Sequence, residues 1–202
     1  MKKLIKIFLL ILLFIQLFTG VGLGQSLLEK VQNKFNSIKD FSADFVQQTN
    51  GNINIKGKIK FKQKDKLRIE LSNILIVSDG KTNWSYNKKR NKIIISSIDE
   101  ENPSVFSIRK LIEEYPRHSN VYEKKEKDTF ILIIEPKKNS GLNFNSAELY
   151  FNSVYQIKKI ITKGTEYGTL KIMFSSYKEN TGLKDSIFKI TPSKETETID
   201  LR

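Results

Sequence analysis

Alternating side chains over residues 52–71 constrain the fold of this chain more than any other feature. The stretch NINIKGKIKFKQKDKLRIEL places a lysine at every second position from Lys56 to Lys66, with mostly apolar residues between the first four of them. Because neighbouring side chains in a strand point to opposite sides, the stretch is predicted to form strands with one apolar and one cationic face. The cationic face would suit nucleic acid or a membrane surface, whereas the apolar face would suit a core or a pocket for a hydrophobic ligand.

Most of the remaining chain also has the pattern of strands. Strands are predicted at 41–49, 53–62, 66–71, 92–98, 129–136, 145–152, 156–163, 168–177 and 186–192, and as a hairpin within 73–86. Helical spacing predicts one helix behind the capping box of Ser26 and Glu29, and another over 102–115 with Pro103 at its start. About ten or eleven strands and two helices predict a mainly β fold, an antiparallel curled sheet that forms a barrel or half-barrel.

The first residues have the layout of an export signal. A basic start precedes an unbroken apolar run over 7–15, and small residues stand at Gly22 and Gly24. This order predicts a signal peptide over 1–24 and a mature domain over 25–202 that is exported and soluble. An uncleaved membrane anchor is the alternative, since the apolar segment approaches the length that spans a bilayer.

The net charge leaves two interpretations open. The whole chain carries a formal charge of +13, and removal of 1–24 takes away three lysines and no acids. A basic surface attracts phosphates, including those of nucleic acid and anionic lipids. Outside the cytoplasm nucleic acid becomes the less favoured partner. A composition rich in lysine, isoleucine and asparagine would also raise the charge without any such role.

The residues offer little for catalysis. His118 is the only histidine and there is no cysteine, which excludes metal sites built on those ligands, Cys–His nucleophiles and disulfides. No glycine-rich phosphate loop follows a strand, and the carboxylates are interleaved with lysines. We therefore expect a binding protein rather than an enzyme, with no metal and no cofactor. Trp84 and Tyr86 could stack on bases or sugars, or pack on the concave face of the sheet.

Five motifs follow one another along the chain: FSADFVQQT (41–49), GKIKFKQKDKLRIEL (57–71), SDGKTNWSYN (78–87), ENPSVFSIRKLI (101–112) and FKITPS (188–193). In this order they resemble the LolA family of periplasmic lipoprotein carriers. SDGKTNWSYN is the most specific match, and it follows the preceding motif as the family's hairpin follows its strand pair. FSADFVQQT is similar to the family's F-x-A-x-F-x-Q start, ENPSVFSIRKLI to its Asn-Pro lid segment, and FKITPS to its closing strand.

The resemblance implies an unclosed β-barrel with two or three helices that act as a lid over a hydrophobic cavity. The cavity for acyl chains is then expected to include Ile55, Ile59, Phe61, Leu67, Ile69, Leu71, Trp84 and Tyr86. The lid is expected to include Leu28, Val31, Phe35, Phe106, Ile108 and Ile112. The resemblance also implies a turn arginine that holds the lid helices shut, and this chain has Gln63 at that position. A glutamine can still donate a hydrogen bond to a helix carbonyl, but it lacks the charge of arginine and its ability to form two parallel hydrogen bonds.

The function implied is that of a monomeric carrier. It would take acylated lipoproteins from an inner-membrane ABC transporter and deliver them to the outer membrane, where an acceptor protein is a further expected partner. Two alternatives remain open at this stage. One is a periplasmic lipid or glycolipid carrier, or an envelope sensor, on the same half-barrel. The other is a basic module that binds anionic polymers through the lysine face.

Overall fold

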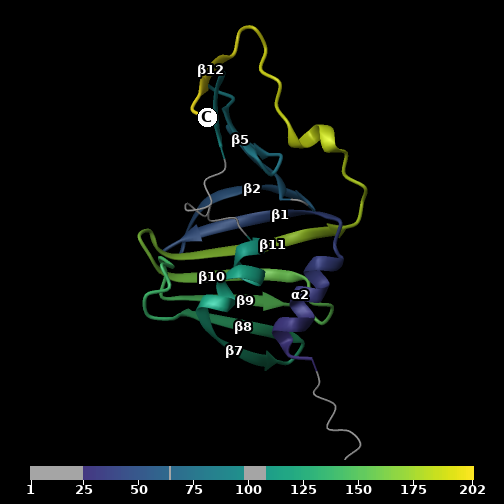
Figure 1. Cartoon of the computed structure of the whole chain (residues 1–202), viewed down its shortest axis with the longest axis vertical. Helices are drawn as coiled ribbons and strands as arrows, with labels where there is room; N and C mark the ends of the chain where they lie inside the picture. Colours follow the sequence, from purple (N-terminus) through teal and green to yellow (C-terminus); the bar gives the residue numbers. More distant parts are fainter. Residues whose placement is uncertain (1–24, 64, 98–107) are drawn as a thin grey trace, which may run out of the picture.

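One large unclosed sheet organises the molecule (Figure 1). The computed structural model describes residues 25–63, 65–97 and 108–202, which form 12 strands in the order β12-β6-β5-β4-β3-β2-β1-β11-β10-β9-β8-β7. Neighbouring strands are antiparallel except β12 and β6, which are parallel, and the outer strands β12 and β7 do not pair with each other. The predicted unclosed antiparallel sheet is therefore confirmed, with 12 strands instead of ten or eleven.

The strand bounds are β1 (Asp40–Thr49), β2 (Asn52–Lys62), β3 (Lys66–Leu71), β4 (Ile74–Ser78), β5 (Thr82–Asn87), β6 (Lys92–Ser97), β7 (Ser119–Glu126), β8 (Thr129–Pro136), β9 (Ser146–Phe151), β10 (Ile157–Thr165), β11 (Gly168–Glu179) and β12 (Glu197–Asp200). The helical elements are α2 (Leu27–Ser37), the π-helix η1 (Lys110–Glu114) and the 3-10 helices η2 (Tyr115–His118) and η3 (Asp185–Phe188). No helix in the described ranges is both long and apolar enough to cross a bilayer.

The predicted N-terminal helix is α2, and its start is fixed as the sequence indicates. The Ser26 hydroxyl accepts a hydrogen bond from the Glu29 amide at 3.1 Å, and the Glu29 carboxylate accepts one from the Ser26 amide at 3.2 Å. This reciprocal capping box satisfies two amides that the first turn leaves without helical partners. The second predicted helix is described only from Ile108 onward, where a helical turn leads into η1 and η2.

The alternation over 52–71 separates two faces of the sheet. In register, Ile59 lies opposite Ala43 on β1 and Ile69 on β3, whereas Lys60 lies opposite Arg68. Ile59 and Ile69 belong to the main core together with the buried side of α2. We call the surface that α2 covers the helix face and the opposite surface the outer face. The apolar side of the alternating stretch therefore forms part of the core, and its lysines lie on the outer face.

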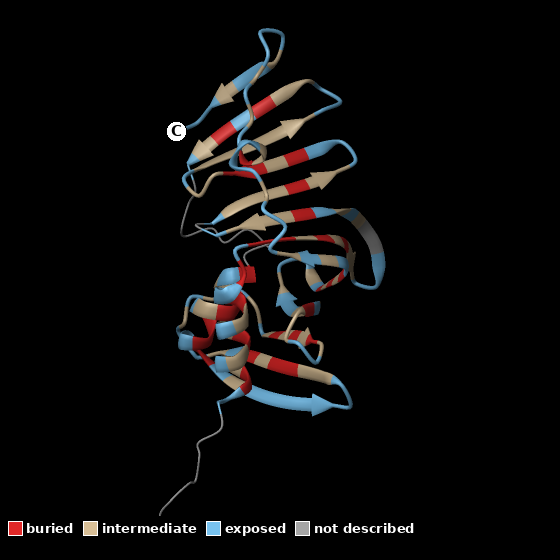
Figure 2. Cartoon of the chain, turned by 90° about the vertical axis from the view of Figure 1, so that its right-hand side faces the viewer, coloured by how far each residue is buried: buried red, intermediate tan, exposed pale blue. Residues whose placement is uncertain are grey.

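The main core lies between the helices and the helix face, at the end of the molecule where Figure 2 shows α2 beside the sheet. Val31 of α2 is 1% exposed, and Ile112 of η1 is 2% exposed. Each such buried side chain contributes roughly 1.5–3 kcal/mol to the free energy of folding. The sheet supplies the following buried members: Phe41, Ala43, Phe45, Ile59, Ile69, Leu132, Ile134, Ala147, Leu149, Phe151, Ile157, Ile160, Ile172 and Phe174.

A second, smaller core lies on the outer face. Phe188 is fully buried there with Leu75 and Val77, and Trp84 and Tyr86 pack against them. The register explains this position, because Trp84 lies opposite Val77, and Val77 lies opposite the outer-face residue Arg68. The prediction that Trp84 and Tyr86 share a face with Leu67 and Ile69 was therefore wrong. Residues 183–190 of the C-terminal segment cover this second core, running over the upper strands in Figure 2.

The structure differs from the predicted strands in three other places. Residues 186–192 do not form a strand; they begin in η3 and hold Phe188 against the outer face. The edge strand β7 was not predicted, because half of its side chains are charged and most of them are exposed. The parallel strand β12 was not predicted either, since its four residues include two acids and show little apolar alternation.

Candidate functional site

The candidate site is a pocket beneath α2. Its lining comes from α2 and the residue after it, from η1 and the turn of helix before it, from β1, β9, β10 and β11, and from the turn between β9 and β10. The lining residues are Val31, Lys34, Phe35, Ile38, Phe41, Ile108, Ile112, Phe151, Tyr155, Ile157 and Tyr177. The space left between these side chains is about 10 Å³, room for no more than a water molecule. A larger apolar ligand can enter only if the helices move away from the sheet.

Aromatic rings fill the boundary between α2 and the sheet. The Phe61 ring lies 5.6 Å from that of Phe35 and 5.4 Å from that of Phe41, and Phe41 stacks on Tyr177 at 5.2 Å. Such contacts are worth about 0.5–1.5 kcal/mol each beyond the area that they bury. Burial, and then the negative charge of Glu179, raise the pKa of the Tyr177 phenol above its usual value. The pocket is therefore a non-polar environment with one carboxylate close to its edge.

Polar contacts hold α2 at both of its ends. The Glu123 carboxylate on β7 accepts hydrogen bonds from the amides of Leu27 at 2.9 Å and Leu28 at 3.1 Å. A carboxylate at this end is favoured by the helix dipole as well. At the other end, Gln63 Nε2 donates to the Asn36 carbonyl at 2.8 Å. Gln63 thus contacts a helix carbonyl as expected, while its role in closing the lid stays a prediction.

The turn between β2 and β3 contacts the second helical segment too. Asp65 Oδ1 lies 2.6 Å from Arg109 Nη1, and Arg109 Nε lies 2.8 Å from Glu113. The hydrogen bonds to Asp65 and Glu113 raise the pKa of the Arg109 guanidinium, so this side chain stays charged. The turn therefore contacts both helices, α2 through Gln63 and the segment before η1 through Asp65. In this contact the arginine, Arg109, belongs to the helical segment, and the carboxylate, Asp65, belongs to the turn.

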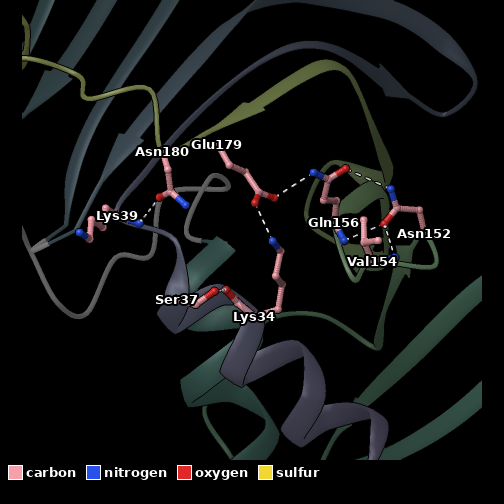
Figure 3. A network of polar contacts seen from close by, with 8 residues as sticks. All are labelled: Lys34, Ser37, Lys39, Asn152, Val154, Gln156, Glu179 and Asn180. Atoms are coloured by element: carbon pink, nitrogen blue, oxygen red, sulfur yellow. Dashed lines mark hydrogen bonds and ion pairs between the residues drawn. The ribbon is translucent and has the colours of Figure 1, made fainter.

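A third group of contacts crosses the long side of α2 (Figure 3). Lys34 Nζ lies 2.6 Å from the Glu179 carboxylate of β11, which also accepts a hydrogen bond from Gln156 Nε2 at 3.0 Å. Asn152 Nδ2 donates to Gln156 Oε1 at 3.1 Å. On the other flank, Gln32 Nε2 donates to the Ile112 carbonyl at 3.0 Å and joins the two helices directly.

The structure brings most of the predicted site residues into the main core, but only some of them line the pocket. Val31, Phe35, Ile108 and Ile112, all predicted for the lid, line the pocket. The predicted cavity residues Ile59 and Ile69 are buried in the same core, and Leu28, Ile55, Phe61, Leu67 and Leu71 pack against it partly buried. None of the predicted cavity residues lines the pocket itself. Phe106 lies outside the described residues, and Trp84 and Tyr86 belong to the other core.

Sequence reasoning missed the sheet side of the pocket. Phe41, Phe151 and Ile157 lie there, together with Tyr155 and Tyr177. The alternation of Ala147, Leu149 and Phe151 was the signal that could have found part of it. Within the described ranges, no group of three or more histidine, cysteine or acidic side chains is placed to hold a metal ion.

An unclosed antiparallel sheet with helices over an apolar pocket defines a class of half-barrel binding proteins. A family model described as outer membrane lipoprotein carrier protein LolA matches residues 36–191. The chain belongs to this LolA family, whose members are carriers. The fold and the family predicted from the sequence are thereby confirmed.

Individual relatives are distant. The uncharacterized protein MJ0687 of Methanocaldococcus jannaschii is 26% identical over 203 residues, which cover 93% of this chain and 57% of that protein. An uncharacterized conserved protein from Thermus thermophilus has a similar structure, with a TM-score of 0.57 and 13% identity over 85% of this chain and 97% of that one. The LolA superfamily protein NE2245 from Nitrosomonas europaea gives a TM-score of 0.42 and 10% identity over 82% and 99% of the two chains.

Proposed function

We propose that this protein is an exported carrier that binds the acyl chains of lipoproteins and moves them from the inner to the outer membrane. The observation that carries the proposal is the construction of the cover over the apolar pocket. α2 and the segment 108–112 pack on the sheet through side chains, and no strand pairing binds them to it. The polar contacts that hold α2 are individual side-chain bonds from Glu123, Gln63, Gln32 and Lys34.

The energetics of the cargo support this arrangement. Burying a methylene group is worth about 0.8 kcal/mol, so a lipoprotein with several long acyl chains does not leave a membrane for water unaided. A carrier must cover these chains and release them again. A cover that can lift while the sheet stays intact meets both needs, because opening then exposes the pocket without unfolding the protein.

The partners follow from this role. The cargo would be received from an inner-membrane ABC transporter and passed to the outer membrane or to an acceptor protein there. Transfer of this kind needs no cofactor in the carrier itself. The family match and the apolar pocket support the proposal from two independent directions.

The test has two stages. Native mass spectrometry of the protein purified from its own envelope should show bound lipoprotein or lipopeptide, and the protein should release labelled lipoproteins from inner-membrane vesicles. A variant with Val31→Glu should fail in the release assay, because the charge lies in the pocket lining. Bound lipid without any release of lipoprotein would favour the lipid-carrier or sensor alternative. Absence of any acyl ligand would refute the proposal.

A further inference from the structure

We propose that the pocket takes amphiphiles whose headgroup is an anion, a carboxylate or a phosphate, and that Lys34 binds this headgroup. The inference goes beyond the proposed function, since it adds to acylated lipoproteins a class of amphiphile whose chains would lie beneath α2 and whose headgroup is an anion. Nothing in the family match assigns a polar subsite to the pocket.

The lining itself gives the first reason. Among the described residues that line the pocket, Lys34 is the charged one, and the others are aliphatic or aromatic. Its side chain is 26% exposed, so it stands at the edge of the pocket with the ammonium group able to meet both water and ligand. An apolar slot with a cation at its edge matches a molecule with a hydrocarbon tail and an anionic head.

Glu179 gives the second reason. Its carboxylate lies 2.6 Å from Lys34 Nζ and is only 13% exposed. An anion is therefore already bound to Lys34 at the pocket edge, and it comes from the protein's own β11. Charge-assisted bonds of this kind are shorter and stronger than those between neutral groups. The geometry that would hold a ligand carboxylate or phosphate is thus present in the closed structure.

The surroundings of Glu179 allow an exchange. Gln156 Nε2 donates to the other carboxylate oxygen at 3.0 Å, and Asn152 holds Gln156 in position (Figure 3). If a ligand anion displaced Glu179 from Lys34, the Glu179 carboxylate would keep its hydrogen bond from Gln156 and its exposure to water. Leaving a buried carboxylate with no partner would be costly, and the Gln156 bond reduces that cost. A neutral headgroup offers Lys34 nothing in exchange, so the pair with Glu179 would persist.

The experiment measures displacement of the neutral fluorophore N-phenyl-1-naphthylamine from the purified protein. The competitors are dodecanoic acid, dodecyl phosphate and dodecanol, each below its micellar concentration, so that chain length is matched and headgroup charge varies. We expect the two anionic competitors to bind roughly tenfold more tightly than dodecanol, as a charge-assisted bond allows. The ratio of the affinities for dodecanoic acid and dodecyl phosphate shows whether a carboxylate or a phosphate is preferred.

Two variants and a control isolate Lys34. Lys34→Met should remove the preference for anions, so that dodecanoic acid and dodecyl phosphate bind no more tightly than dodecanol. Glu179→Gln should change the preference in the opposite direction, because Lys34 then lacks its internal anion. The control is Lys58→Met, which removes the same charge from a side chain that is 66% exposed on the outer face and should not alter the ratios. The opposite signs also separate a binding effect from loss of fold, which thermal melting would report.

Equal affinity for all three competitors in the unmodified protein would overturn the inference while leaving the proposed function in place. The inference would also be overturned if Lys34→Met weakened the binding of all three competitors by the same factor. If none of the competitors displaces the fluorophore and mass spectrometry finds no acyl ligand, the proposed function itself fails.

Discussion

Gln63 and Asp65 are single residues of one turn that contact the two helical parts of the cover. The neutral hydrogen bond from Gln63 to Asn36 contributes roughly 0.5–1.5 kcal/mol, and the ion pair of Asp65 with Arg109 about 0–1 kcal/mol because both partners are largely exposed. Contacts of this size add only a small bias toward the closed state, beside the larger contribution of the buried apolar side chains of the cover. The contact of Gln63 could be expected from the family resemblance. The pair of Asp65 and Arg109 joins residues 44 positions apart and depends on the helix placement, which no local pattern shows.

We predict that Asp65→Asn speeds entry of a ligand more than it affects stability. The free energy of unfolding should fall by less than about 1 kcal/mol, as for other exposed ion pairs. The association rate of N-phenyl-1-naphthylamine, measured by stopped-flow fluorescence, should rise because one contact to the cover is lost. Asp128→Asn, in the exposed turn after β7, serves as the control with the same chemical change. An unchanged association rate would show that Asp65 plays no part in opening.

Leu67 tests whether the helix face is the working surface. The side chain packs against the main core partly buried, so Leu67→Glu should leave the fold intact while it impairs transfer of acylated cargo. The matched control is Lys56→Glu on the exposed outer face of β2, since Lys60, another outer-face lysine, is bound to Glu70 at 2.9 Å. Both variants would be compared by thermal melting and by lipoprotein release from vesicles. Normal transfer by Leu67→Glu together with failure of Lys56→Glu would assign the function to the outer face.

The C-terminal segment is an element whose position the sequence did not reveal. Its apolar residues alternate with polar ones over 186–192, which predicted a strand, yet the backbone forms η3. Side-chain contacts explain the difference. The buried Asp40 carboxylate accepts hydrogen bonds from the amides of Thr181, Gly182 and Leu183, and Arg68 Nη1 donates to the Ile187 carbonyl at 3.0 Å. These contacts lead the chain from the end of β11 across the outer face.

We predict that Phe188→Ala destabilises the protein by about 3–5 kcal/mol, the usual cost of removing a fully buried ring. Trp84 is the only tryptophan and belongs to the same core, so its fluorescence should shift toward that of an exposed indole. Ile94→Ala, at a side chain that is 39% exposed, should change neither the midpoint of urea unfolding nor the emission. An unshifted Trp84 spectrum in Phe188→Ala would contradict the existence of this second core.

Acid should release the same segment. Burial raises the pKa of Asp40, but hydrogen bonds from Thr181, Leu183 and Gly182 outweigh it and bring the pKa below the usual 3.8. Bonds from Lys62 and Lys66 lower the pKa of Asp185 to about 2. A carboxyl whose pKa is lowered on folding stabilises the protein above its unfolded value and loses this contribution as the pH falls through the folded one.

The expected result is a change in Trp84 emission between pH 3.8 and about 2, the interval set by Asp185. In Asp40→Asn the segment should be less stable at neutral pH and the acid dependence smaller, because the amide does not titrate in this range. Emission that stays constant down to pH 2, with the fold retained, would show that the carboxylates do not hold the segment.

At the scale of the whole molecule, two cores lie on opposite faces of one sheet. The main core lies on the helix face from β3 to β8, and the C-terminal segment covers the outer face of β3 to β5. The strands themselves were predictable because their two-residue period is local. Which face is covered was not, since it depends on segments that return from far along the chain. Trp84 was assigned to the wrong face for this reason.

The export prediction also concerns the whole molecule. We expect the mature protein to begin near Gln25 and to occur in the soluble periplasmic fraction, because residues 1–24 have the order of a signal peptide. N-terminal sequencing of the envelope fractions would check both statements. Recovery of membrane-bound protein that still carries Met1 would contradict them.

The unequal attachment of α2 has a mechanical consequence. The Asn36 end continues through two residues into β1 and is also held by Gln63 and by the ion pair of Lys34 with Glu179, whereas the Glu123 carboxylate holds the Leu27 end. The helix can therefore behave as a lever that pivots where it joins β1. With 11 residues it is about 16 Å long, so a tilt of about 20° lifts its Leu27 end by about 5 Å. That displacement exceeds the width of a methylene chain, and it requires no strand of the sheet to separate from its neighbour.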